Sequence, residues 1–97
     1  MDRKTLAIAE MKVELSYQQQ GKCAACGEPV AVQEAELAHK IPQRKYLLKM
    51  YGPEVIHHRL NVCLTHHGAC NDKMSIGGNP VAMDKLANEI REERSKR

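Results

Sequence analysis

The sequence predicts a small domain of the α+β class, with a helix at each end of a mixed central region. Apolar residues repeat at helical spacing in the first 20 positions and again after Pro80, and two short apolar segments between them have the composition of strands. With 97 residues, no tryptophan and no phenylalanine, the chain can build only a modest core. We therefore expect an additional staple in the central region.

The first helix is predicted over residues 1–20. Apolar residues recur there every three or four positions, which puts their side chains on one side of a helix. Gly21 follows, and glycine commonly ends helices because it adopts the left-handed backbone conformation at little cost. The predicted apolar face consists of Leu6, Ala9, Val13 and Tyr17, with Ile8, Met11 and Leu15 beside them.

Residues 22–77 form the predicted central region, and residues 80–95 form the second flanking helix. No repeat and no linker-like tract divides the chain, so residues 1–97 are predicted to be a single domain. Runs of Val, Ile, Leu and Ala indicate strands, and Pro42 and Gly52 mark the ends of elements. The predicted strands are 30–32, 34–41 and 60–65, the short helices are 44–51 and 66–74, and the last helix carries Met83, Leu86, Ala87 and Ile90 on its apolar face.

Two cysteines lie close together in the segment Cys23-Ala24-Ala25-Cys26-Gly27. Pairs with this spacing turn around a metal ion or form a redox couple. No strand-helix-strand pattern of the thioredoxin type surrounds this pair, so we prefer the metal interpretation. A disulfide in a secreted domain is the remaining alternative, and the start of the chain has no apolar signal-peptide segment that would support it.

Residues 61–71 contain more than one pair of residues that could supply the other two metal ligands. Structural zinc takes four thiolate or imidazole ligands as two closely spaced pairs. His66 and Cys70 flank a predicted strand-to-helix turn, whereas Cys63 lies inside an apolar run, where a free thiol packs as a small hydrophobe. The predicted structural zinc ligands are Cys23, Cys26, His66 and Cys70, and Cys63 stays as the alternative to His66.

A net charge of +3 and an isoelectric point near 8.7 permit contact with a polyanion without requiring it. Basic residues after position 90 alternate with glutamates and fit a solvated helix face. No apolar run reaches the roughly 20 residues that cross a bilayer, so we expect no membrane contact and a cytoplasmic location. The predicted phosphate-contacting residues are Lys40, Arg44, Lys45 and Lys49.

The order of these motifs resembles the HNH endonuclease family, also called the ββα-metal or His-Me finger nucleases. The resemblance depends on the C-x-x-C pair, on Glu36-Leu37-Ala38-His39-Lys40-Ile41-Pro42, on an asparagine that opens an apolar strand, and on Cys70-Asn71 at a helix start. In the family pattern an asparagine stands five residues before a zinc ligand, and Asn61 stands five residues before His66. This register favours His66 over Cys63. The resemblance covers residues 22–77.

The resemblance implies a ββα-metal fold and a metal-dependent endonuclease that hydrolyses or nicks DNA. It implies that His39 is the general base, that Asn61 orients His39 or binds the catalytic Mg²⁺ or Mn²⁺, and that Asn71 presents an amide oxygen to that ion. The zinc would be structural, because four protein ligands leave no open position. The implied partners are DNA and, from the habits of small HNH proteins in phage and bacterial genomes, packaging or other DNA-processing proteins.

One position departs from the family pattern. Many family members have Asp or His directly before the catalytic histidine as a ligand of the catalytic metal, and this chain has Ala38. Looser metal binding through Asn61, Asn71 and water, compensation by His67, or loss of activity would each follow from that departure. The alternative function is therefore a zinc-stapled DNA-binding or adaptor module without chemistry.

Overall fold

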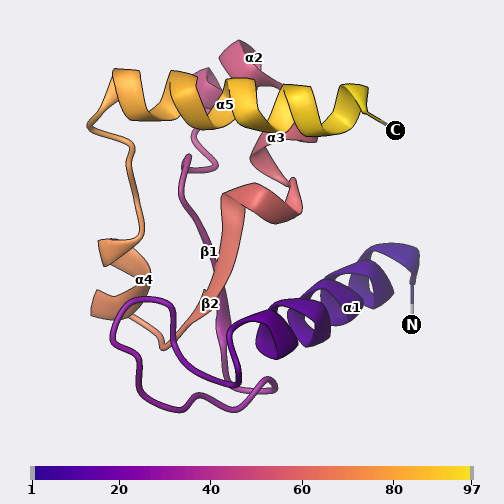
Figure 1. Cartoon of the computed structure of the whole chain (residues 1–97), viewed down its shortest axis with the longest axis vertical. Helices are drawn as coiled ribbons and strands as arrows, with labels where there is room; N and C mark the ends of the chain where they lie inside the picture. The colour runs from indigo at the N-terminus through magenta and orange to yellow at the C-terminus, as the bar shows by residue number, and fades with distance from the viewer. Residues whose placement is uncertain (1, 97) are drawn as a thin grey trace.

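The computed structural model describes residues 2–96, and its centre is a two-stranded antiparallel sheet (Figure 1). Helix α4 lies on one side of the sheet and α1 on the other, while α2, α3 and α5 gather at one end of it. The predicted α+β class with two flanking helices is confirmed. The elements are α1 Arg3–Gln18, β1 Glu36–His39, α2 Lys45–Tyr51, α3 Pro53–Ile56, the 3-10 turn η1 Arg59–Asn61, β2 Val62–Thr65, α4 Ala69–Lys73 and α5 Pro80–Ser95.

The register of the sheet decides which side chains share a face. Ala38 of β1 lies directly opposite Cys63 of β2. Side chains alternate along a strand, so Glu36 shares the face of Ala38, whereas Leu37 and His39 share the other face. Ala38 and Cys63 are buried, with exposed fractions of 0% and 7%. His39 and Glu36 therefore belong to opposite faces of the same strand.

Helix α1 begins after Asp2, whose side chain caps it. The predicted broad apolar face is only partly buried, because Leu6, Val13 and Tyr17 are exposed, the last by 88%. Leu15, on the neighbouring side of the helix, is 6% exposed and belongs to a small core against the sheet. The apolar residues of α1 cover a wider part of the helix than the sheet contacts, and the position of the sheet decides which part is buried. The small core consists of Leu15, Ala35, Val62 and Leu64.

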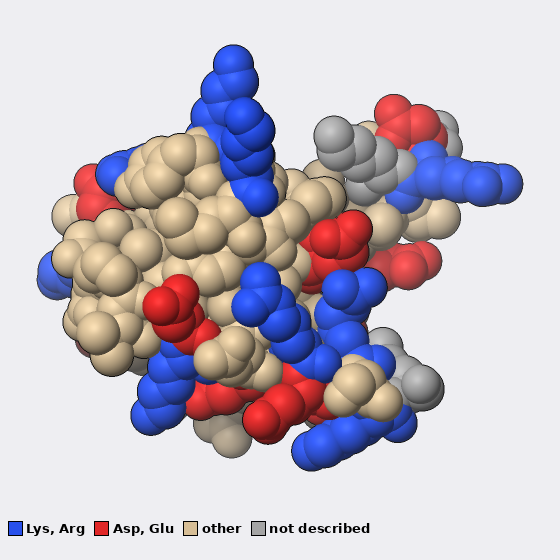
Figure 2. All heavy atoms as spheres, turned by 90° about the horizontal axis from the view of Figure 1, so that it is seen from above, with Lys and Arg blue, Asp and Glu red and all other residues tan. Residues whose placement is uncertain are grey.

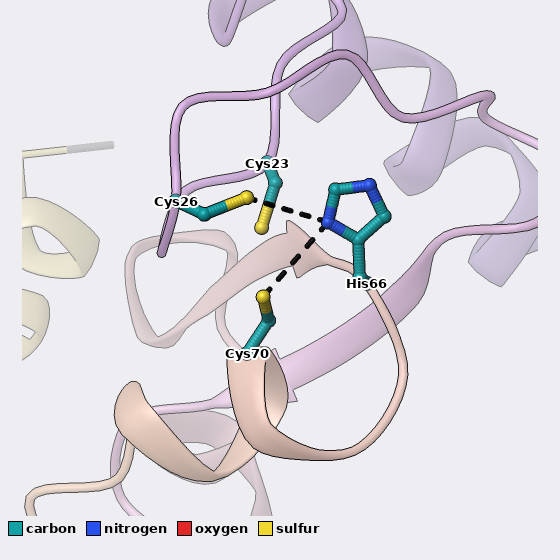
Figure 3. A group of neighbouring side chains, drawn as sticks. All are labelled: Cys23, Cys26, His66 and Cys70. Atoms are coloured by element: carbon teal, nitrogen blue, oxygen red, sulfur yellow. Dashed lines mark hydrogen bonds between the residues drawn. The ribbon is translucent and has the colours of Figure 1, made fainter.

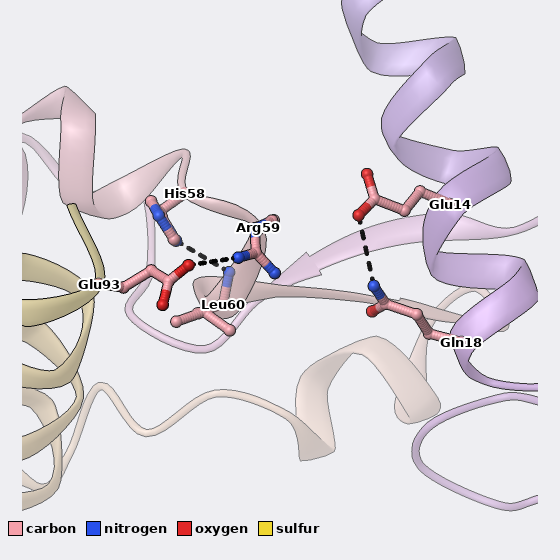
Figure 4. A network of polar contacts seen from close by, with 6 residues as sticks. All are labelled: Glu14, Gln18, His58, Arg59, Leu60 and Glu93. Carbon is pink, nitrogen blue, oxygen red and sulfur yellow. Dashed lines mark hydrogen bonds and ion pairs between the residues drawn. The ribbon is translucent and has the colours of Figure 1, made fainter. Parts of the chain in front are cut away.

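A larger core joins α2, α3 and α5. Polar contacts lie around it: Tyr51 Oη donates to Asp84 Oδ1 at 2.5 Å, and Arg59 Nη2 donates to Glu93 Oε1 at 2.6 Å, which ties η1 to α5 (Figure 4). This helical core encloses one end of the sheet. Its buried members are Ile41, Leu47, Tyr51, Val55, Ile56, Met83, Ala87 and Ile90.

Several segments differ from the sequence predictions. Residues 30–32 form no strand, because their only neighbouring pairing is a single bridge between Lys22 and Pro29. Residues 59–61 form η1 instead of the start of a strand, since the Asn61 N–H donates to the His58 carbonyl at 2.9 Å. The helix predicted over 66–74 begins only at Ala69, and α3 is too short for its periodicity to be visible in the sequence.

No helix within residues 2–96 is long and apolar enough to cross a membrane. On the face of the molecule seen from above α5, Lys and Arg side chains are interleaved with Asp and Glu (Figure 2). That face has mixed charge and no continuous basic patch. This distribution agrees with the interpretation of the C-terminal charges as a solvated helix surface.

Candidate metal centre and histidine site

Four side chains from three segments meet in one cluster (Figure 3). Cys23 and Cys26 come from the loop after α1, His66 follows β2, and Cys70 lies in the first turn of α4. Their ligand atoms lie within 4.8 Å of one another, and His66 Nδ1 is 3.5 Å from Cys26 Sγ and 3.9 Å from Cys70 Sγ. Nitrogen and sulfur ligands of a tetrahedral zinc ion are about 3.6 Å apart, given Zn–S near 2.3 Å and Zn–N near 2.1 Å. The predicted cluster is confirmed, and it can hold a metal ion such as zinc.

Backbone groups prepare this cluster for a metal. The Pro29 carbonyl accepts a hydrogen bond from His66 Nε2 at 3.1 Å, which leaves the Nδ1 lone pair directed at the sulfurs. The Ala25 N–H donates to Cys23 Sγ at 3.4 Å. Burial raises the pKa of Cys23, but hydrogen bonds from the backbone of Cys26, His66 and Ala25 outweigh burial and lower this pKa to about 6. The thiolate is the form that binds a metal.

Cys63 does not belong to the cluster. It is 7% exposed, its Sγ lies 3.9 Å from the Ala38 carbonyl, and burial raises its pKa, so it is a buried neutral thiol. Burial and the neighbouring sulfurs of Cys23 and Cys26 also raise the pKa of Cys70, and a cation between the thiolates would relieve that repulsion. Cys63 is therefore excluded as the alternative to His66 in this arrangement.

His39 ends β1 and stands where two surface grooves meet. The first, which we name the edge groove, follows the free edge of β1 toward α4, and the second, the helix groove, lies between α1 and the sheet. The edge groove is lined by Leu37, His39, Pro42, Gln43, Arg44, Asn71, Asp72 and Ser75. The helix groove is lined by Ala7, Ile8, Met11, Leu37, His39, Gln43, His57 and Val62. His39 is thus accessible to a substrate in either groove.

The surroundings of His39 favour its neutral form. Burial lowers its pKa, the charge of His57 lowers it further, and a hydrogen bond with the backbone of Leu37 opposes both. The side-chain amide of Gln43 lies 3.3 Å from Nδ1. Because an amide nitrogen only donates, Gln43 Nε2 donates to Nδ1, and Nδ1 is the ring nitrogen that holds the lone pair a general base needs.

Asn61 reaches neither groove. Its side chain is 0% exposed; Oδ1 accepts from the Ile41 N–H at 2.8 Å, and Nδ2 donates to the carbonyls of Ile41 and Ile56 at 3.1 and 2.8 Å. A buried amide must satisfy its hydrogen bonds, and here three backbone groups do so. The prediction that Asn61 binds the catalytic metal is therefore wrong. Asn61 instead fixes the backbone that follows His39, so any effect on the orientation of His39 is indirect.

Asn71 lines the edge groove and contacts the other face of β1. Its Nδ2 donates to Glu36 Oε1 at 2.9 Å, and His67 Nδ1 lies 2.7 Å from Glu36 Oε2. Hydrogen bonds from Asn71 and then from His67 lower the pKa of Glu36, with burial opposing them. Thr65, directly opposite Glu36, has a buried hydroxyl without a hydrogen-bond partner among the described residues. The two predicted residues Asn71 and His67 thus converge on one carboxylate.

The four basic residues do not form one patch. Arg44 lines the edge groove beside His39, whereas Lys45 and Lys49 lie along α2 around an exposed tyrosine, Tyr46. Lys40 is half-buried next to β1. Of this set, Arg44 is consequently the residue that lines the edge groove together with His39.

Sequence reasoning missed how Glu36, Gln43 and His57 take part in the site. Glu36 was detectable, because strand alternation puts it on the face of Ala38, where the family pattern expects a metal ligand. Contacts of Gln43 and His57 with His39 depend on loop geometry and leave no periodic signal.

No model of a known protein family matches the chain, and neither a curated protein nor a solved structure matches it.

Proposed function

We propose that this protein is a metal-dependent endonuclease that hydrolyses DNA phosphodiester bonds, with His39 as the general base. The observation that carries the proposal is the edge groove itself. It brings His39 from β1, Arg44 from the start of α2 and Asn71 from α4 to one surface. A neutral imidazole, a phosphate-binding cation and an amide beside a carboxylate are the groups that phosphodiester hydrolysis requires.

His39 would remove a proton from the attacking water. Burial keeps the pKa of His39 low, so the ring is neutral near pH 7 and can accept that proton. Arg44 would hold the phosphate by charge-assisted hydrogen bonds and position it without reading sequence. Low sequence specificity follows from the small number of such contacts.

Glu36 and Asn71 are the groups that would hold the catalytic Mg²⁺ or Mn²⁺, with His67 as a third ligand. Adjacent ligands of an octahedral ion with bonds near 2.1 Å lie about 3 Å apart. In the structure these groups are hydrogen-bonded to one another, with Asn71 Nδ2 at 2.9 Å and His67 Nδ1 at 2.7 Å from the two Glu36 oxygens. To bind the ion, Asn71 would turn its amide oxygen toward it and His67 would present a nitrogen lone pair. The ion would stabilise the negative charge that develops on the phosphate oxygens. Glu36 would thereby replace the ligand missing at Ala38.

Zinc is the metal that we propose for the cluster of Cys23, Cys26, His66 and Cys70. Three thiolates and an imidazole in tetrahedral spacing suit zinc and leave no open position for catalysis. Its role would be structural. By holding α4 against the end of β2, it would keep Asn71 beside Glu36.

The test is cleavage of supercoiled plasmid by purified protein with Mg²⁺ or Mn²⁺, compared with the His39→Ala variant. We expect cleavage by the natural chain, none after chelation of the divalent ion, and at least a 100-fold loss in His39→Ala, the scale of a lost general base. His58→Ala is a matched control, since His58 lies outside both grooves. Equal cleavage by the natural chain and His39→Ala, or none by either, contradicts the proposal.

A second candidate is a zinc-stapled DNA-binding or adaptor module without chemistry. The fully buried Ala38, which offers no ligand where the family pattern has one, favours it. Plasmid binding without cleavage under all divalent ions would support it. With either function, we propose a cytoplasmic protein whose partners are DNA and, in a phage or bacterial setting, packaging or other DNA-processing proteins.

A further inference from the structure

One chemistry-bearing side chain in the helix groove has no role in the proposed mechanism. His57, the residue at the end of α3, has its ring centre 5.5 Å from that of His39, with the two ring planes at 88°. The two histidines come from separate elements, both line the helix groove, and their rings contact each other edge to face. His57 is exposed, so nothing among the described residues covers it from a substrate.

We propose that His57 is a second catalytic residue: the general acid that gives a proton to the oxygen leaving from phosphorus. This inference rests on the proposed nuclease function, and it adds the group that completes the proton transfers. Alkoxide is a poor leaving group at neutral pH, so protonation of the leaving oxygen accelerates hydrolysis by about 100-fold or more.

The spacing of the two rings fits a single phosphate group. Hydrogen bonds from nitrogen to oxygen are about 2.9 Å long. The two rings are in edge-to-face contact, with centres 5.5 Å apart and planes at 88°, so no phosphate fits between them. A phosphate that lies beside the pair in the groove can accept a hydrogen bond from each ring.

The environments assign the two roles. His39 is half-buried and His57 is exposed, and water stabilises the charged form of an imidazole. Burial disfavours the charged form of His39, which is thus the member suited to accept a proton, and this leaves His57 as the member to donate one. The remaining lining of the groove, which carries no other titratable side chain, is Ala7, Ile8, Met11, Leu37, Gln43 and Val62.

The step balances with water as the only co-reactant. His39 takes one proton from water while the water oxygen forms a bond to phosphorus. The bond from phosphorus to the leaving oxygen breaks with its electron pair on that oxygen, and His57 supplies the proton that makes it a hydroxyl. Afterwards His39 releases its proton to solvent and His57 regains one.

The test compares two substrates that differ in their need for an acid. In plasmid DNA the leaving group is a sugar alkoxide, which needs a proton. In bis(p-nitrophenyl) phosphate the leaving group is p-nitrophenolate, which needs none. We expect His57→Ala to lose about 100-fold on plasmid and less than about 3-fold on the ester, whereas His39→Ala loses both activities. His58→Ala, with an imidazole that accepts from the Leu60 N–H outside the groove, should retain both.

A second readout uses plasmid alone. Because the proposed step needs a protonated acid, cleavage by the natural chain should decline at high pH, and His57→Ala should lack this alkaline decline. Equal losses on both substrates, or an unchanged alkaline decline in His57→Ala, overturn the assignment of His57 while His39 stays the base. No hydrolysis of either substrate by the natural chain overturns the nuclease function together with it.

Discussion

The two ends of the sheet are stabilised by different means. At one end, α2, α3 and α5 enclose the sheet in a helical core of eight buried residues. At the other end the small core has four buried residues, and the cluster of Cys23, Cys26, His66 and Cys70 lies beside it. The first end has the larger apolar core, whereas the second has a smaller core beside a cluster that can hold a metal ion.

The comparison shows why the candidate site lies where it does. β1 and β2 extend in opposite directions between the metal end and the helical core, and His39 is the last residue of β1. Asn71 is held by the metal end through α4, while Asn61 of the other end fixes the chain after His39. The edge groove is therefore bounded by both ends, and damage to either one should open it.

The largest effect should come from Cys26→Ser, which removes a metal ligand. Structural zinc is commonly worth about 10 kcal/mol in small domains, comparable with the whole stability of a domain. We expect loss of bound zinc and loss of cooperative unfolding. Amide exchange should show α4 and residues 19–35 unprotected, with some protection left around Leu47 and Ile90. Metal content, thermal melting and hydrogen exchange measure these three results.

Cys63→Ala is the matched control for that substitution. Cys63 is a buried thiol near the Ala38 carbonyl and is not part of the cluster. Zinc content should therefore stay unchanged, while the free energy of unfolding falls by about 1 kcal/mol. If Cys26→Ser keeps its melting temperature, or if Cys63→Ala releases the metal, the division into a metal end and a helical core is wrong.

The next effect concerns the joint between the two ends. Asn61→Ala leaves the Ile41 N–H and the carbonyls of Ile41 and Ile56 buried without partners. An unsatisfied buried polar group costs about 1–3 kcal/mol, so the variant should lose about 3 kcal/mol or more in urea unfolding while it keeps its zinc. Asn61→Asp retains an acceptor for the Ile41 N–H but loses both donated bonds.

Those losses should be accompanied by normal metal binding at the cluster. A variant of Asn61 that unfolds no more easily than the natural chain would show that its hydrogen bonds contribute nothing net. Unchanged stability combined with lost Mn²⁺ binding would instead restore Asn61 as a metal ligand.

The sequence predicted the metal end better than it predicted the joint. Ligand spacing is a local property, so Cys23, Cys26, His66 and Cys70 were identified without knowledge of the fold, and the strand position of Cys63 marked it as a buried residue. The flanking helices followed from periodicity. The contact between Asn71 and Glu36 also lies between segments that the predicted ββα order brings together.

The wrong predictions concern residues whose environment is decided by tertiary packing. The apolar pattern of α1 marked two faces, and only packing against the sheet selects Leu15 over Tyr17. Asn61 has the same identity whether it faces a metal or three backbone groups, so its burial was not readable. The turn after α3 places His57 beside His39, and the helical core sets the geometry of that turn.

The smallest expected effect is a change in the pKa of His39, which lies between the two ends of the sheet. Burial and then the charge of His57 lower the pKa of His39 from about 6.5. In NMR titration of the ring protons, the midpoint of His39 should lie below about 6.5, and His57→Ala should move it upward because one of the two causes is removed. Protein lacking the His57 charge but showing an unchanged midpoint would mean that burial alone acts.

The same shift has a consequence for stability with a definite sign. Because the pKa of His39 is lower in the folded than in the unfolded chain, the unfolded chain binds more protons as the pH falls below about 6.5. Stability at neutral pH is therefore lost as the pH falls from there through the folded pKa, and His39→Gln should reduce that loss. The residual decline in His39→Gln would come from protonation of the metal ligands, which releases the metal. Zinc release followed alongside unfolding separates the two, since only protonation of the metal ligands is accompanied by release of the metal. The pH dependence thus distinguishes the titration of the groove from the titration of the metal end.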